Sequence, residues 1–172
     1  MNAMTPKRPA NKSAIKPAIV ISASGWRKAV PGLAARARVV AAATYEAALA
    51  DGASPLTGET TIAFADDAAI RPLNAQFRGK DKATNVLSFP GLHGGGDVIL
   101  ALETTQKEAE IQGKSMPDHT AHLIAHGILH LMGYDHEEGR QQARRMERLE
   151  QRVLSGLGID DPYTAKGTEK HR

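Results

Sequence analysis

The sequence predicts one compact domain that combines helices with strands. Its 172 residues, of which 41% are apolar, suffice for a single buried core and leave little room for a second one. Short apolar runs bounded by turn residues predict strands, whereas longer segments with apolar residues at helical spacing predict helices. Both kinds of segment occur along the chain without an internal repeat. We therefore expect a single domain of mixed secondary structure.

The first half of the chain predicts two strands and two helices. A strand is expected at residues 18–22, and after a turn at residues 24–25 an alanine-rich helix is expected from residue 31 to residue 50. Residues 59–65 predict the second strand, and Asp66 can cap the helix that follows it. That helix carries three apolar residues on one face, namely Ile70, Leu73 and Phe77.

The second half predicts a pair of strands and three helices. The strands cover residues 86–89 and 97–102, and their order along the chain favours a hairpin. The glycines at 94–96 predict a flexible loop rather than a phosphate cradle, because neither a Gly-Lys-Ser sequence nor a helix start follows them. The three helices, each ended by glycine, are expected at residues 103–112, 118–132 and 138–157.

Three histidines have the spacing of metal ligands. His126 and His130 share one face of the predicted helix, about 6 Å apart along its axis, so both imidazoles can reach one ion. Gly133 permits the left-handed turn that brings His136 back toward them. Three neutral imidazoles leave one tetrahedral position open, which is typical of a catalytic zinc. We therefore predict one zinc ion per chain.

Other interpretations of the histidines are less favoured. His122 lies about 12 Å of helix rise from His130, which excludes a site with three ligands in line. We expect His119 and His122 to lie on a polar helix face or to support the ligands by hydrogen bonds. The chain has no cysteine, so thiolate ligands and disulfides are impossible. Imidazole sites also accept nickel, copper and iron.

The charge of the chain is mildly basic. Its 22 lysine and arginine residues exceed its 19 acidic residues, which gives a net charge of +3 and favours encounter with polyanions such as RNA. Four arginines recur every four residues in the last predicted helix: Arg140, Arg144, Arg148 and Arg152. This row fits either a contact with a phosphate backbone or a solvated face partly compensated by Glu147 and Glu150.

The spacing His-x3-His-x2-Gly-x2-His is also found in an extended zinc-protease motif. In that motif a glutamate follows the first histidine and acts as the general base, but Gly127 occupies the position here. Glycine cannot accept a proton, which argues against a standard metalloprotease.

The chain resembles the YbeY family of bacterial zinc-dependent endoribonucleases. The resemblance extends over residues 17–163 and is most specific in the histidine stretch at 126–136. Residues 78–90, which begin Arg-Gly-Lys-Asp and end Asn-Val-Leu-Ser-Phe-Pro, strengthen it. Further matches are Gly-Asp-Val-Ile-Leu at 96–100 and Asp-Pro-Tyr at 161–163.

The family resemblance implies an α+β fold in which a small mixed sheet is backed by helices. It places the zinc site at the end of a central helix and its return loop, with His126, His130 and His136 as the ligands. It also implies that Arg78 faces the cleft and acts in catalysis, where a guanidinium can hold the scissile phosphate.

The expected domain organisation has three parts. Residues 1–16 form a flexible basic leader, residues 17–163 a single catalytic domain, and residues 164–172 a flexible tail. No apolar run approaches the roughly 20 residues of a membrane span, so a cytoplasmic protein without membrane contact is expected.

The function implied by the resemblance is cleavage of single-stranded RNA in the maturation of ribosomal RNA, at the 3′ end of the small-subunit RNA, and in ribosome quality control. Implied partners are the small ribosomal subunit and assembly factors, including a GTPase and a small-subunit ribosomal protein. Two alternatives remain open. One is a peptide or amide hydrolase with a base such as Asp135, and the other is a non-catalytic ribosome-assembly factor with a structural zinc.

Overall fold

The computed structural model describes residues 14–164, so most of the predicted leader and tail lies outside the described residues. The strands are β1 (Ala18–Ile21), β2 (Thr60–Ala65), β3 (Val86–Pro90) and β4 (Gly96–Ala101). The helices are α1 (Gly25–Ala29), α2 (Leu33–Ala50), α3 (Asp67–Arg78), α4 (Leu102–Gln112), α5 (Met116–Leu131) and α6 (Arg140–Gly156).

The four strands form one mixed sheet in the order β1-β2-β4-β3. β1 and β4 both pair with β2 in parallel, whereas β3 pairs with β4 in the antiparallel direction. The predicted hairpin is thereby confirmed, and so is the α+β fold with a small mixed sheet. β3 is an edge strand, because its second side has no partner strand among the described residues.

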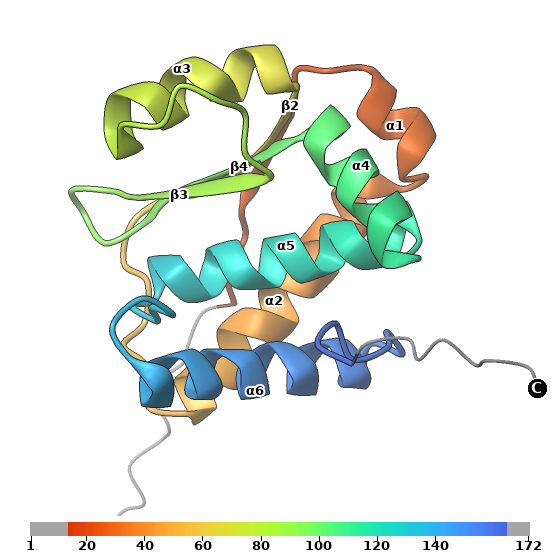
Figure 1. The fold of residues 1–172 in the computed structure, drawn as a ribbon. Helices are drawn as coiled ribbons and strands as arrows, with labels where there is room; N and C mark the ends of the chain where they lie inside the picture. Colours follow the sequence, from red (N-terminus) through yellow and green to blue (C-terminus); the bar gives the residue numbers. More distant parts are fainter. Residues whose placement is uncertain (1–13, 165–172) are drawn as a thin grey trace, which may run out of the picture.

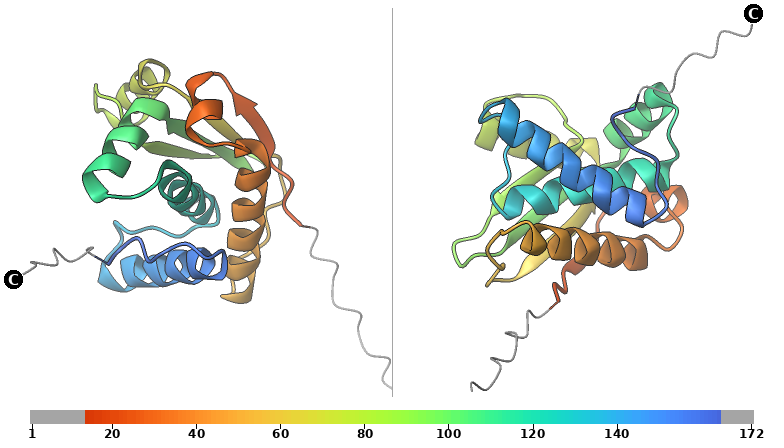
Figure 2. Two further views of the ribbon diagram at one scale, coloured as in Figure 1. Left: turned by 90° about the vertical axis from the view of Figure 1, so that its right-hand side faces the viewer. Right: turned by 90° about the horizontal axis from the view of Figure 1, so that it is seen from below.

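Helices cover both faces of this sheet (Figure 1). α3 packs over one face, and α5 packs over the other against β3 and β4. Figure 2 (left) shows α5 end-on, with the sheet above it, α2 beside it and α6 below it. α5 is therefore the central helix of the domain, and its apolar residues Ile124, Ile128 and Leu129 are almost fully buried. Between residues 14 and 164, no helix is both long and apolar enough to cross a membrane.

The short helix α1 replaces the turn that the sequence predicted at residues 24–25, and α2 begins two residues later than expected. Trp26 explains why this segment is ordered. Its ring is fully buried against Phe64, at a centroid distance of 5.1 Å, and its indole nitrogen donates a hydrogen bond to the carbonyl of Ala65 at 2.7 Å. A helix of five residues is too short to show a periodic apolar pattern.

The central helix approaches the sheet closely at Gly127. A Cβ atom at this position would lie 2.5 Å from Cγ1 of Val98 on β4 and 3.3 Å from the hydroxyl of Ser88 on β3. The Ser88 hydroxyl donates a hydrogen bond to the Gly127 carbonyl at 3.2 Å. Position 127 therefore faces the sheet and has no room for a side chain, which explains why the glutamate of the protease motif is missing.

We predict that Gly127→Ala destabilises the protein. Alanine favours a helix by up to about 1 kcal/mol over glycine, but overpacking a core costs about 1–3 kcal/mol. With the full helix gain subtracted, the expected net loss is up to about 2 kcal/mol in chemical denaturation. Gly156→Ala is the matched control, because that glycine lies in α6 with open space around it. Equal stability of the two variants would contradict the close approach of α5 to the sheet.

Candidate metal centre

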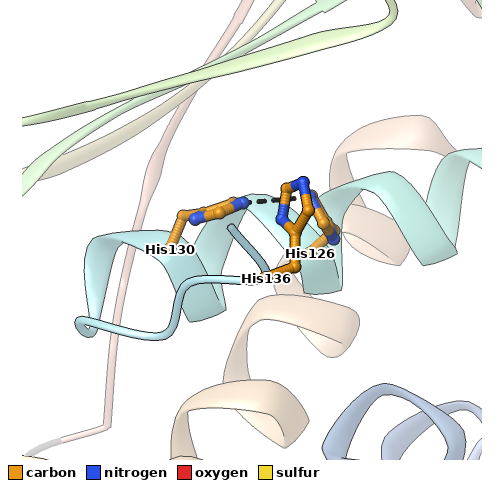
Figure 3. A group of neighbouring side chains, drawn as sticks. All are labelled: His126, His130 and His136. Atoms are coloured by element: carbon orange, nitrogen blue, oxygen red, sulfur yellow. Dashed lines mark hydrogen bonds between the residues drawn. The ribbon is translucent and has the colours of Figure 1, made fainter. Parts of the chain in front are cut away.

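The three predicted ligands converge at the C-terminal end of α5 (Figure 3). His126 and His130 lie one turn apart on α5, and His136 returns from the loop that follows it. One ring nitrogen from each residue lies within 4.8 Å of the others. The Nε2 atoms of His126 and His130 are 3.0 Å apart, close to the roughly 3.3 Å between two nitrogens on one tetrahedral zinc. The three imidazoles can therefore hold a single metal ion.

The return loop is fixed where it leaves α5. Gly133 has a φ of 92°, the left-handed conformation that the sequence predicted. The next residue, Tyr134, is buried, and its hydroxyl donates a hydrogen bond to Asp51 at the end of α2 at 2.6 Å. Arg145 of α6 donates to the same carboxylate at 2.7 Å. Hydrogen bonding to Tyr134 lowers the pKa of Asp51 and thereby keeps this carboxylate ionised.

The buried carboxylate of Glu150 is hydrogen-bonded to the ligand His126. Glu150 of α6 is fully buried, and its Oε1 atom lies 2.6 Å from Nδ1 of His126. Its Oε2 atom lies 2.9 Å from Nε2 of His122 and accepts a hydrogen bond from the hydroxyl of Tyr163. A carboxylate can only accept, so the His126 ring carries its proton on Nδ1 and turns the Nε2 lone pair toward the other ligands.

The hydrogen bonds outweigh the burial of Glu150. Burial alone raises the pKa of a carboxyl group, but hydrogen bonds from His122 and His126 lower the pKa of Glu150 to about 2. Burial and the Glu150 carboxylate in turn raise the pKa of Tyr163, so its hydroxyl remains a donor. Glu150 is therefore an ionised acceptor that orients His126.

One of the two alternatives for the arginine row placed Glu150 on a solvated helix face, but Glu150 is fully buried. The missed signal is its position in the apolar stripe of α6, because Glu150 lies four residues after Met146 and four before Leu154, both buried. An acid inside such a stripe indicates a buried, paired charge. The four arginines of the predicted row are all exposed, namely Arg140, Arg144, Arg148 and Arg152.

The two other histidines of α5 differ in role. His122 is hydrogen-bonded to Glu150, which in turn is hydrogen-bonded to His126. This agrees with the predicted alternative in which His122 supports the ligands by hydrogen bonds. His119 is only 2% exposed, so the polar-face alternative is wrong for this residue. Its Nε2 atom instead lies 2.8 Å from Glu108 of α4, which also accepts from Asn85. His119 therefore links α5 to α4 and to the segment before β3.

The low pKa of His130 favours metal binding. Burial, together with the charges of His126 and His136, lowers the pKa of His130 to about 4. His130 is thus neutral near pH 7 and presents a lone pair. His136 is exposed, so the site opens to solvent on the side of the return loop.

Arg78, the predicted catalytic residue, is the last residue of α3 and is exposed. In the part of the chain that the structure describes, its side chain has no ion pair or hydrogen bond. α3 and α5 cover opposite faces of the sheet (Figure 1). The structure therefore gives no contact between Arg78 and the three histidines.

We predict that Glu150→Gln weakens zinc binding about 10- to 100-fold. This is the usual effect of removing a carboxylate that accepts a hydrogen bond from a ligand histidine. Competition with a chromophoric chelator measures this dissociation constant. Glu147→Gln is the matched control, because Glu147 lies on the same helix and bonds to no histidine. An unchanged dissociation constant in Glu150→Gln would show that Glu150 does not orient the ligand.

Comparisons with known proteins agree with this geometry. The family model described as "Endoribonuclease YbeY" matches residues 31–158. A relative from Paramagnetospirillum magneticum named "Endoribonuclease YbeY" is 44% identical in an alignment of 162 residues that covers 87% of this chain and 96% of the relative. Another of that name, from Methylocella silvestris, is 55% identical in an alignment of 113 residues that covers 61% of this chain and 62% of the relative.

A solved structure shows the same fold. The solution structure of TM1509 from Thermotoga maritima matches with a TM-score of 0.54 and 19% sequence identity, and the match covers 91% of this chain and all of that one. The predicted family is confirmed by the family model and by the sequence relatives. The chain belongs to the YbeY family of endoribonucleases.

Proposed function

We propose that the protein is a zinc-dependent endoribonuclease that hydrolyses phosphodiester bonds in single-stranded regions of ribosomal RNA. One observation carries the proposal. Three imidazole nitrogens lie within 4.8 Å of one another, at a solvent-open position, in a chain of an endoribonuclease family. The position that holds the general base of a zinc protease faces the sheet instead, so no comparable observation favours peptide hydrolysis.

The donor set fits zinc. His126, His130 and His136 supply three nitrogen ligands, and zinc accepts such a set while keeping a fourth position open. When bound, a zinc ion of this kind lowers the pKa of its water to about 7 and supplies a nucleophile at neutral pH. We propose one ion per chain, because the residues that the structure describes contain one such group.

Other residues of the chain would position the ligands and bind the RNA. Glu150 fixes the tautomer and direction of His126, and the Tyr134–Asp51 hydrogen bond fixes the loop that carries His136. Arg78 would bind a phosphate of the RNA and stabilise the charge that develops on it, for which its guanidinium is exposed and unpaired. Arg78 therefore stays a proposed catalytic residue.

The cellular role proposed here follows the family resemblance. We assign the activity to the cytoplasm, where it would act at the 3′ end of the small-subunit RNA and in ribosome quality control. The proposed partners are the small subunit and its assembly factors, including a GTPase and a ribosomal protein. The exposed arginines of α6 and the net charge of +3 support a polyanionic partner.

His130→Ala tests the metal-dependent activity. We expect this variant to lose both its bound zinc and its cleavage of a single-stranded RNA, whereas the parent carries about one ion per chain and cleaves. His93→Ala, which removes an exposed histidine from the β3–β4 loop, should retain both. Elemental analysis and gel assays of identically purified proteins give the two readouts. Equal cleavage by all three preparations would assign the activity to a contaminating nuclease.

Arg78→Glu tests the phosphate role. Loss of one stabilising donor typically lowers kcat about 100-fold or more, so we expect that loss together with unchanged zinc content. Arg27→Glu makes the same change of charge at an exposed residue of α1 and should cleave at the parent rate. If the two variants cleave equally well, Arg78 has no part in catalysis.

A further inference from the structure

An aromatic ring is exposed beside the edge of the sheet. Phe77, in the last turn of α3, keeps 59% of its surface accessible. Its ring packs edge-to-face against Phe89 of the edge strand β3, with the centroids 5.0 Å apart. This contact holds the Phe77 ring in place and leaves much of it uncovered. Helix propensity does not require an aromatic residue at such a position, so the exposed ring is available to a ligand.

Three cations follow this ring in the sequence and are all exposed: Arg78, Lys80 and Lys82. None of them forms an ion pair within residues 14–164. The acid between them, Asp81, is already occupied, because Arg71 donates two hydrogen bonds to its carboxylate at 2.8 and 3.3 Å. The charge that remains beside Phe77 is therefore positive.

The segment that carries these cations is held to α3. Asn74 is buried, and its side-chain amide donates a hydrogen bond to the carbonyl of Lys82 at 2.9 Å. The backbone N–H of Lys80 donates to the carbonyl of Asn74 at 3.2 Å, and Gly79 adopts the left-handed conformation that ends the helix. The cations thus have a defined backbone position relative to the Phe77 ring, which reduces the entropy lost on binding.

We propose that Phe77, Lys80 and Lys82 form a binding surface for single-stranded RNA next to Arg78, here called the Phe77 surface. An unpaired base would stack on the exposed ring, and the neighbouring phosphates would contact the cations. A protein partner would not need unpaired cations directly after an exposed ring in the chain, whereas a polyanion with free aromatic faces uses both. A duplex presents no free base face, so the surface selects single strands.

This inference rests on the proposed function, because it names how the same RNA is held next to Arg78. α3 lies across the sheet from α5 (Figure 1). RNA that reaches both elements would pass the edge strand β3. The Phe77 surface would therefore contribute to binding of RNA that is long enough to extend past this strand.

Fluorescence anisotropy with a labelled 12-nucleotide oligouridine tests the surface in the full chain. We expect Phe77→Ala to raise the dissociation constant about tenfold, within the roughly five- to 150-fold range that corresponds to stacking of one base. Phe77→Leu should bind as weakly, because leucine is apolar but has no ring, and Phe77→Trp should bind like the parent. Ile111→Ala, which removes an apolar residue of 75% exposure on α4, is the matched control.

Two further readouts separate the outcomes. The parent has one tryptophan, Trp26, which is buried, so the exposed indole introduced by Phe77→Trp should be quenched by the oligouridine and not by a duplex of equal length. Cleavage kinetics should show a raised KM for long RNA in Phe77→Ala with kcat unchanged. If Phe77→Ala binds the oligouridine as tightly as the parent, the proposal is wrong. If Phe77→Leu binds as tightly as the parent, the ring makes an apolar contact and no base stacks on it.

The failure of either proposal can be recognised. Phe77-dependent binding by a parent that cleaves no RNA would retain the surface and remove the proposed enzymatic function. Normal cleavage without any dependence of KM on Phe77 would retain the enzyme and remove the surface. The melting temperature of each variant shows that the chain remains folded in these comparisons.

Discussion

The ionised carboxylate of Glu150, buried between α5 and α6, is the constraint on which the metal centre depends. A buried charge is strongly unfavourable unless hydrogen bonds compensate it. Here His122, His126 and Tyr163 provide those bonds, so they tie together α5, α6 and the segment that follows α6. The same bonds that make Glu150 tolerable in the interior set the orientation of His126. The interactions that fold this part of the chain therefore also orient the metal ligand.

The close approach of α5 to the sheet is the second constraint. Because Gly127 has no side chain, the central helix packs directly on Val98 of β4, and its opposite side is free to face α6 and Glu150. The histidines are consequently carried by the most buried helix of the domain rather than by a loop. Only His136 comes from a loop, and Tyr134 anchors that loop to Asp51. A ligand set held by packed elements needs little rearrangement when a metal binds.

The sequence predicted the regular elements well because their apolar residues recur at the period of a helix or strand over many residues. The triad was predicted for a similar reason, since helix pitch and the glycine turn are both local rules. α1 was missed because its order depends on Trp26 contacting Phe64 and Ala65, about forty residues away. The hydrogen-bond partners of Glu150 and His119 were not predicted, because they lie on other helices and no local pattern identifies such partners.

X-ray absorption at the zinc edge of the purified protein tests the central claim most directly. We expect about one ion per chain with roughly three imidazole nitrogens at about 2.0–2.1 Å, the remaining position being filled by oxygen. In Glu150→Gln the same ligands should appear at lower occupancy, because this variant loses the acceptor that orients His126. An ion bound without imidazole ligands, or a fully folded protein that binds no metal at all, would contradict the account.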